Sequence, residues 1–390
     1  MNCIIKTASL LTLAAAMLVS CDKEQPEGNT GVGVGIDIPD LVVAFDKNVV
    51  RNNGEVATLK AYYKGEDVSD KTDFFRMEGG GAKLMGSRTF SSTTVGKYSF
   101  KAAYLTATSK EVSITVVDRE IPGAVADPYP SSTTFVHRAF LNQHTGAGCG
   151  YCPGMTKLLK ETLVDDIADR VVLAAIRGYG GGESGFAMIP NPSASYPFLH
   201  IDYAEYPKMS YQTPVAQLAA MIEGRTMTPA LVGISANPVY YEETKQVIVR
   251  VTVKAAQTGE YNVGLWLLQD NYYKLQTDNL GIIKGGAKDP YNYHNNCVRL
   301  ADSEYLGAHV GYPLGVLEAG QTADWVFVFD LKNAIENAKN KGGWWESFSA
   351  EKLDDLHFAA FVTTHKGSTY TVVNAIDFPY NTPTSFEYLN

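Results

Sequence analysis

The sequence predicts a multi-domain protein in which an α/β domain lies between two all-β sandwich domains. Three observations predict this arrangement. A chain of 390 residues is long enough for two or three domains, and its 45% hydrophobic residues can supply packed cores. Both ends of the chain are rich in short runs that alternate between apolar and polar residues, as half-buried strands do. Between them, a helical pattern follows one strand-like run and precedes another, which predicts a β-α-β start.

The N-terminal segment is expected to be a secretion signal. Residues 1–20 include an apolar run of about a dozen residues, which is shorter than the roughly 20 needed to span a membrane. The run ends in Leu18-Val19-Ser20-Cys21, the pattern of a bacterial lipoprotein signal. Cys21 is therefore predicted to be the lipid anchor, with an ordinary secretory signal and a chance cysteine as the alternative. Residues 21–39 are polar and glycine-containing, which predicts a flexible tether.

Residues 40–119 are predicted to form an immunoglobulin-like β-sandwich. The runs Leu41–Phe45, Tyr98–Tyr104 and Val112–Val116 are strand-like, and glycines between such runs indicate turns. A stretch of about 80 residues with this pattern is typical of immunoglobulin-like modules. No catalytic grouping occurs in it, so a spacer is the expected role. Residues 121–130 contain three prolines and a glycine and are predicted to form a linker.

Residues 131–228 carry the α/β pattern. Phe135–Leu141 is a strand-like run, and the apolar positions of Met155–Ile167 fall on one face of a helix. Val171–Ile176 is continuously apolar, as expected for a central strand that is covered on both faces. The order of strand, helix and buried strand predicts a parallel β-α-β unit.

The segment Cys149-Gly150-Tyr151-Cys152-Pro153 stands at the start of that helix. Two cysteines at this spacing are typical of a redox-active disulfide centre. The chain has 5 cysteines, and beyond Cys3 and Cys21 only this pair and Cys297 remain. Disulfides are therefore not a structural framework here, which favours a chemical role for the pair over a structural one. No second CxxC is present, which disfavours a zinc site.

The expected chemistry of the pair follows from its place at a helix start. A thiolate attacks disulfides, and the free amides and dipole at a helix N-terminus stabilise that thiolate. Cys149 is therefore the predicted nucleophile. Cys152 lies about one turn further on and is the predicted resolving cysteine, which would release a mixed disulfide.

This arrangement of strand, Thr145-Gly146, CGYCP motif and helix resembles the thioredoxin superfamily. More narrowly, the chain is similar to the outer membrane protein 28-related family of thioredoxin-like lipoproteins. The strings His294–Arg299, Phe358–Val362 and Val372–Ala375 support the narrower resemblance, which covers residue 131 to the C-terminus. The resemblance implies a thioredoxin-like domain at residues 131–228.

The resemblance also implies a cis-proline beside the cysteines. Pro207 is the candidate and Pro229 is the runner-up. The family usually has tryptophan before the first cysteine, where this chain has Gly148, so a less sheltered loop is expected. The Gly-Tyr pair between the cysteines is similar to that of periplasmic disulfide isomerases, which favours reduction or isomerisation over oxidation.

Residues 229–390 are again β-rich and predict a jelly-roll-like sandwich. Five alternating or apolar runs are expected to be strands: Gln246–Lys254, Val263–Leu268, Trp325–Phe329, Leu356–Thr364 and Tyr370–Ile376. The complete expectation is an α/β thioredoxin-like domain flanked by two all-β sandwich domains, N-terminal immunoglobulin-like and C-terminal jelly-roll-like.

Two functional classes follow. The first is a lipid-anchored cell-envelope protein acting as a thiol–disulfide reductase or isomerase on exported proteins. The second is a surface binding or adhesion lipoprotein that uses the thioredoxin-like domain as a scaffold. Either class places the protein at the outer membrane, facing the periplasm or the cell surface. No cofactor or metal is expected, and a net charge of −9 without a basic stripe disfavours nucleic acid as a partner.

Overall fold

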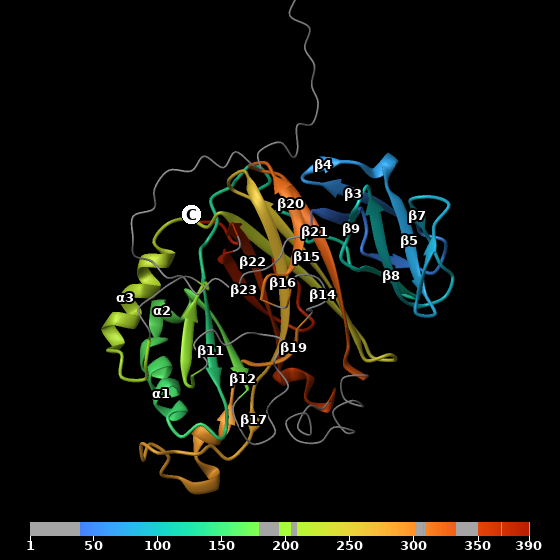
Figure 1. Cartoon of the computed structure of the whole chain (residues 1–390). Coiled ribbons are helices and arrows are strands. Elements are labelled where there is room, and N and C mark those ends of the chain that lie inside the picture. Colours follow the sequence, from blue (N-terminus) through green and yellow to red (C-terminus); the bar gives the residue numbers. More distant parts are fainter. Residues whose placement is uncertain are drawn as a thin grey trace, which may run out of the picture. The chain divides into compact units, whose positions relative to one another are not determined.

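The computed structural model describes residues 40–178, 195–203, 209–301, 307, 309–332, 350–367 and 369–389. They form two compact units, the first extending to Val116 and the second beginning at Val117 (Figure 1). The predicted lipoprotein signal, Cys21, the tether and Pro207 lie outside the described residues. No helix within the described ranges is long and apolar enough to cross a membrane.

The first unit consists of two sheets, in which the pairings of β1 with β3, β8 with β10 and β5 with β8 are antiparallel. One sheet has the order β1-β3-β4, with β7 paired to β3, and the other has the order β2-β10-β8-β5-β6, with β9 paired to β8. The elements are β1 (Leu41–Phe45), β2 (Val49–Arg51), β3 (Ala57–Tyr63), β4 (Glu66–Asp67), η1 (Ser69–Lys71), β5 (Asp73–Glu78), β6 (Gly81–Leu84), β7 (Thr89–Phe90), β8 (Gly96–Tyr104), β9 (Ala107–Thr108) and β10 (Val112–Val117). Alternate residues of β1, β3 and β10 are buried, which accounts for the period-two pattern of their sequences.

The second unit contains the cysteine pair and the remaining strands. Its helices are α1 (Cys152–Thr162), α2 (Asp165–Ala168), α3 (Val215–Thr226), η3 (Gly286–Lys288), η4 (Pro290–Asn292) and η6 (Ala350–Asp355). Its strands are β11 (Ala139–Thr145), β12 (Val171–Arg177), β13 (Phe198–Ile201), β14 (Val232–Tyr241), β15 (Gln246–Ala255), β16 (Gly259–Gln269), β17 (Tyr272–Tyr273), β18 (Tyr293–His294), β19 (Cys297–Ala301), β20 (Tyr312–Leu317), β21 (Thr322–Asp330), β22 (Leu356–Lys366) and β23 (Thr369–Pro379).

One large mixed sheet organises this unit. Its order is β13-β11-β12-β19-β16-β22-β23, with β20 also paired to β16. β11 and β12 are parallel, with Ala139 opposite Val171, and β13 is antiparallel to β11. β12 is parallel to β19, where Ala175 lies opposite Cys297. The remaining contacts, β19 with β16, β16 with β22 and β22 with β23, are antiparallel.

The predicted fold class is wrong. Strands dominate the second unit, and β11, β12 and β13 belong to the same sheet as β16, β19, β22 and β23 rather than to a separate α/β thioredoxin-like domain between two sandwiches. The physical reason is that the apolar face of β11 is completed by strands far along the chain. The ring of Phe140 lies 5.1 Å from that of Trp266 and 5.0 Å from that of Phe361.

The two longer helices cover the other face of β11 and β13 (Figure 1). Leu141 and Ile201 on the strands pack with Leu158 of α1 and with Leu218 and Ile222 of α3, all of them buried. These positions account for the apolar stripe that predicted the helix. The local order of strand, cysteines, helix and parallel strand is therefore as predicted, although its place in the fold differs.

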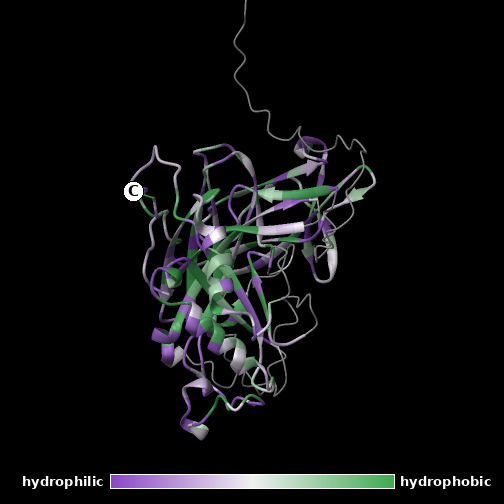
Figure 2. Ribbon diagram, turned by 90° about the vertical axis from the view of Figure 1, so that its left-hand side faces the viewer, coloured by the Kyte–Doolittle hydropathy of each residue, from purple (hydrophilic) through white to green (hydrophobic). Residues whose placement is uncertain are grey.

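The C-terminal strands form a sandwich with the three-stranded sheet β14-β15-β21. Val249 of β15 and Phe327 of β21 are buried in one cluster with Leu265 of β16 and Phe358 of β22. Figure 2 shows the central strands mostly in green, the colour of hydrophobic residues. All five runs predicted to be strands in this region are found within β15, β16, β21, β22 and β23.

The segment 121–130, expected to be a linker, is bound along the surface of β15. Arg250 donates a hydrogen bond of 2.6 Å to the Pro122 carbonyl. The Lys254 ammonium lies 2.8 Å from the Asp127 carboxylate, and only 2% of the Lys254 side chain is exposed. The segment is therefore part of the second unit.

Candidate functional site

Cys149 and Cys152 form a disulfide at the N-terminus of α1. β11 ends at Thr145, a short loop follows, and α1 begins at Cys152. Pro153 lies in the first turn, where a backbone N–H has no intrahelical partner to lose. The strand before the pair begins at Ala139, four residues later than the sequence suggested.

In the reduced pair, a thiolate would be stabilised by the N-terminus of α1 and not by a charged histidine. The first turn of α1 contains no acidic side chain, so the amides and dipole of the helix act unopposed there. Burial lowers the pKa of His144, near the end of β11, to about 3, and the nearby His200 adds to this shift. Burial also lowers the pKa of His200 to about 4. Both histidines are neutral at physiological pH and add no positive charge.

Both cysteines are almost inaccessible to solvent. Cys149 is 3% exposed and Cys152 is 1% exposed. The expectation of a less sheltered loop, based on Gly148 in place of tryptophan, is therefore wrong. A distant segment, residues Tyr272–His294, leaves the sheet after β16, hydrogen-bonds the disulfide loop and returns to β19. We call this segment the cap.

The cap binds the disulfide loop through backbone carbonyl groups. Gln276 places its Nε2 at 2.9 Å from the Cys149 carbonyl oxygen, and within hydrogen-bond distance of two further carbonyls, those of Gly146 and Ala147. The backbone N–H of Thr277 donates to the Ala147 carbonyl at 2.8 Å. Two residues further on, the backbone N–H of Asn279 donates to the Gly150 carbonyl, also at 2.8 Å.

Two glycines in the disulfide loop and helix allow this close approach. A Cβ at Gly150 would lie 2.7 Å from Asn279 Oδ1 and closer still to its Cγ. A Cβ at Gly154 would lie 2.7 Å from Leu280 Cδ1 and 2.9 Å from Tyr211 Cδ2. These distances are shorter than van der Waals contact, so a side chain at either position would push against the cap.

The cap has its own folded form. β17 and β18 close its base, with Tyr272 paired to His294. The Asp278 carboxylate accepts hydrogen bonds from two backbone N–H groups of the cap, at 2.7 and 2.8 Å. Burial opposes the charge, but these bonds outweigh it and hold the pKa of Asp278 below its usual value. Asp289 accepts three backbone N–H bonds in the same way.

The third cysteine is not part of this site. Cys297 forms no disulfide, is fully buried in β19, and its Sγ lies 3.6 Å from the Asn295 carbonyl oxygen. His294 makes a separate contact, with its Nε2 at 3.0 Å from the Lys274 carbonyl oxygen. Burial lowers the pKa of His294 to about 3, so it is neutral.

The cis-proline expectation is tested only in part. Pro207 lies outside the described residues, so its peptide bond stays a prediction. Within the described ranges, the cis peptide bond that the structure shows joins Tyr196 and Pro197, directly before β13.

A second titratable cluster lies where the neighbouring strands β16, β22 and β23 of the large sheet begin or end. His357 of β22 places Nδ1 at 2.7 Å from the Asp377 carboxylate and Nε2 at 3.5 Å from the Asp270 carboxylate. Burial alone would lower the pKa of His357, but the two carboxylates outweigh burial and raise it to about 9. The cluster is an internal ion pair, which accounts for it without a ligand.

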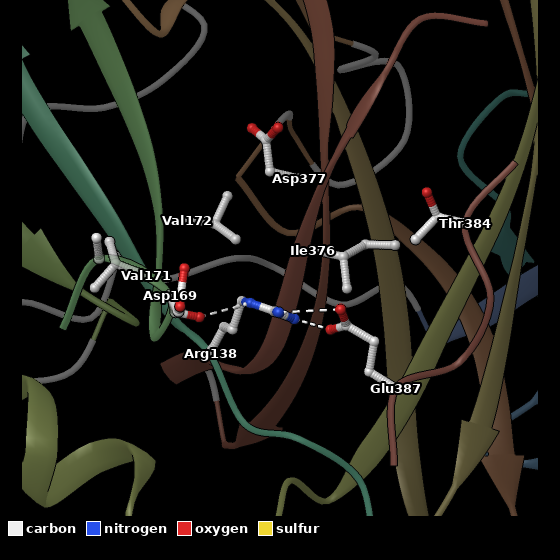
Figure 3. Close-up of a pocket in the computed structure, with 9 residues that line it drawn as sticks. Arg138, Asp169, Val171, Val172, Ile376, Asp377, Thr384 and Glu387 are labelled. Carbon is white, nitrogen blue, oxygen red and sulfur yellow. Dashed lines mark hydrogen bonds and ion pairs between the residues drawn. The ribbon is translucent and has the colours of Figure 1, made fainter. Parts of the chain in front are cut away.

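A small pocket lies at the opposite end of β11 from the disulfide. Figure 3 shows the Arg138 guanidinium between Asp169, whose backbone carbonyl accepts from Nε at 2.9 Å, and the Glu387 carboxylate. Arg138 precedes the first residue of β11 and the cysteines follow its last, so about 20 Å of strand separates the two places. The arginine is already paired, so the pocket is not part of the disulfide site.

No metal centre accompanies the disulfide in the parts of the chain that the structure describes. There, no group of three or more His, Cys, Asp or Glu side chains is arranged to hold a metal ion.

Comparisons with known proteins give little further guidance. No family model matches the chain, and no curated protein matches it. Among solved structures, HBP35 of Porphyromonas gingivalis matches with a TM-score of 0.46 and 16% sequence identity, over 63% of this chain and 76% of that chain. A likeness this low supports no conclusion about fold or function. The resemblance to the outer membrane protein 28-related family stays a prediction.

Proposed function

We propose that the chain is a lipid-anchored cell-envelope protein whose Cys149–Cys152 pair exchanges thiols and disulfides with exported proteins. One observation carries the proposal: the two cysteines form an intramolecular disulfide at the N-terminus of α1. A pair in this position has a favoured thiolate, because the helix amides stabilise negative charge on sulfur. The remaining described cysteine, Cys297, is buried and forms no disulfide, so the Cys149–Cys152 bond is not part of a structural framework.

In the reducing direction, the Cys149 thiolate attacks one sulfur of a substrate disulfide. The substrate S–S bond breaks, and its other sulfur leaves as a thiolate. Cys152 then attacks Cys149 Sγ, which forms the internal disulfide and releases the substrate as a dithiol. A dithiol donor in the cell envelope must afterwards reduce the pair, and it becomes a disulfide as the two electrons pass to the cysteines. Isomerisation uses the first step and its reversal at a different substrate sulfur.

The anchor and the location are part of the same proposal. The sequence Leu18-Val19-Ser20-Cys21 supports lipid attachment at Cys21, which would hold the protein at the outer membrane, facing the periplasm or the cell surface. Exported proteins with thiols or disulfides are the proposed partners at that location.

A second candidate is a surface binding or adhesion lipoprotein in which the disulfide is structural. The burial of the pair favours it, because 3% and 1% exposure of the two cysteines leaves no open path for a substrate. An exchange centre must be accessible at least transiently, whereas a structural bond benefits from protection.

Trapping separates the two candidates. Cys152→Ser removes the resolving thiol, so a working Cys149 should accumulate mixed disulfides with exported proteins. These adducts should disappear on reduction and should be absent from the matched Cys149→Ser/Cys152→Ser variant. A structural disulfide predicts no adducts and a clear loss of thermal stability when the pair is reduced.

A further inference from the structure

The cap contacts the disulfide loop through two alternate backbone N–H groups. Thr277 and Asn279 donate their N–H groups to carbonyls of the loop, each at 2.8 Å. These donors are two residues apart, the spacing at which an extended chain directs successive N–H groups to the same side. The acceptors are the carbonyls of Ala147 and Gly150, which lie on both sides of Cys149.

This pattern of contacts requires little sequence specificity. Backbone N–H groups are supplied by every residue except proline, so many extended segments could make the same two bonds. Gly150 has no side chain, and the space beside it is filled by the side chain of Asn279. We call the Ala147 and Gly150 carbonyls the carbonyl edge. This edge therefore fits an extended polypeptide that carries a small polar side chain opposite Gly150.

We propose that Gln276–Leu280 occupies the carbonyl edge and that this edge is the docking site for an extended segment of a substrate polypeptide. The substrate reaches the disulfide by displacing this part of the cap. The inference rests on the function proposed above and adds the form in which the substrate binds. Because Cys149 is only 3% exposed, an attacking sulfur needs a local opening, and the cap segment is hydrogen-bonded to the loop on both sides of Cys149. The cap is thus an internal competitor of the substrate.

The structure of the cap permits such a displacement. None of residues 273–288, all of which the structure describes, is buried. Three large apolar side chains of the cap, Tyr273, Leu275 and Tyr293, are 44%, 61% and 47% exposed. Segments with few buried apolar contacts open at a low free-energy cost, so the tip can leave while the core stays folded. The buried Tyr272 ring keeps the base of the cap attached to the sheet.

A rate measurement on the purified full chain tests the inference. Gln276→Ala removes the side-chain donor to the loop carbonyls, and Gln217→Ala, at an exposed position of α3, is the matched control. The probes are dithiothreitol and two cysteine-containing decapeptides of the same sequence, one of them N-methylated at alternate residues. Opening of the Cys149–Cys152 bond is followed by alkylation of the thiols that appear.

We expect Gln276→Ala to react about five- to tenfold faster than wild type with every probe, and Gln217→Ala to match wild type. The unmethylated peptide should react several-fold faster than the N-methylated peptide, which has lost the N–H donors. Leu280→Ala, which removes the cap's apolar contact with Gly154, should act in the same direction and guards against misfolding of Gln276→Ala.

Each remaining outcome has a distinct meaning. Equal rates for Gln276→Ala, Leu280→Ala and wild type would show that the cap does not restrict access. Equal rates for the two peptides would show that substrate does not dock on the carbonyl edge. Either result would overturn the inference while leaving trapped adducts of Cys152→Ser, and with them the proposed function, intact. A pair that resists every probe in all variants would instead refute the proposed function.

Discussion

Replacing Gly150 by alanine should release the cap without unfolding the core. The new Cβ would lie 2.7 Å from Asn279 Oδ1 and closer to its Cγ, which is overpacking. Overpacking in a core typically costs about 1–3 kcal/mol. Here the crowded neighbour is an exposed side chain of the cap, so the cap moves and the strands beneath it do not. A shift of about 1–2 kcal/mol raises the open population roughly 5- to 30-fold.

The assay is the rate at which dithiothreitol reduces the Cys149–Cys152 bond. If only the open form reacts, the rate should rise by the same factor as the open population. Asn279→Gly in the Gly150→Ala background removes the crowded side chain and keeps the backbone donor, so it should restore a rate near that of wild type.

A core glycine gives the contrasting result. A Cβ at Gly264 would lie 2.6 Å from Phe361 Cε1, inside the large sheet's apolar cluster, so Gly264→Ala should lower the melting temperature without a selective gain in reduction rate. The reasoning is refuted if Gly150→Ala is reduced at the wild-type rate. It is equally refuted if Gly150→Ala lowers the melting temperature as much as Gly264→Ala does.

Three further predictions concern other parts of the chain. Cys21→Ala should move the protein from the membrane fraction to the soluble fraction, and undiminished membrane association would exclude the lipid anchor. In reduced protein below pH 7, Cys149 should alkylate faster than the other two thiols of the folded units, because the helix N-terminus favours its thiolate; equal rates would remove its assignment as nucleophile. His357 has a folded pKa of about 9 against 6.5 unfolded, so its stabilising charge is fully present below pH 6.5 and is lost as pH rises through 9. Chemical denaturation should show unfolding free energy falling by up to about 3 kcal/mol over that range, and His357→Gln should lose this dependence.

Local patterns predicted local structure well. The five C-terminal runs are strands because each alternates or is continuously apolar, and burial in a sheet requires those patterns. The cysteines stand at a helix start, as their spacing and Pro153 indicated. The predicted helix Met155–Ile167 is divided, because the chain leaves helical geometry at Leu163 and Asp165 has a φ of +48°.

The partners of each strand could not be predicted in the same way. β12 pairs with β19 through Ala175 and Cys297, more than a hundred residues apart in the chain. An apolar run shows that a strand is covered but does not identify what covers it. Family resemblance therefore led to a separate α/β domain, whereas the structure continues that sheet into the C-terminal strands.

The cap was missed for a related reason. Residues between Tyr272 and His294 include Asp278, Asp289 and several glycines, which indicate a loop with tight turns. Nothing in that composition indicates that the loop covers the disulfide. Gly150 was interpreted through redox chemistry, although the structure shows that its missing side chain also makes room for Asn279.

The reduction potential of the Cys149–Cys152 pair, measured at equilibrium with glutathione in the purified full chain, tests the central claim most directly. Catalysts of thiol–disulfide exchange have potentials between about −270 and −120 mV, whereas structural disulfides of secreted proteins typically lie below about −300 mV. An exchange centre predicts a value in the first range. A value below about −300 mV would contradict it and would identify the disulfide as a structural bond of a binding protein.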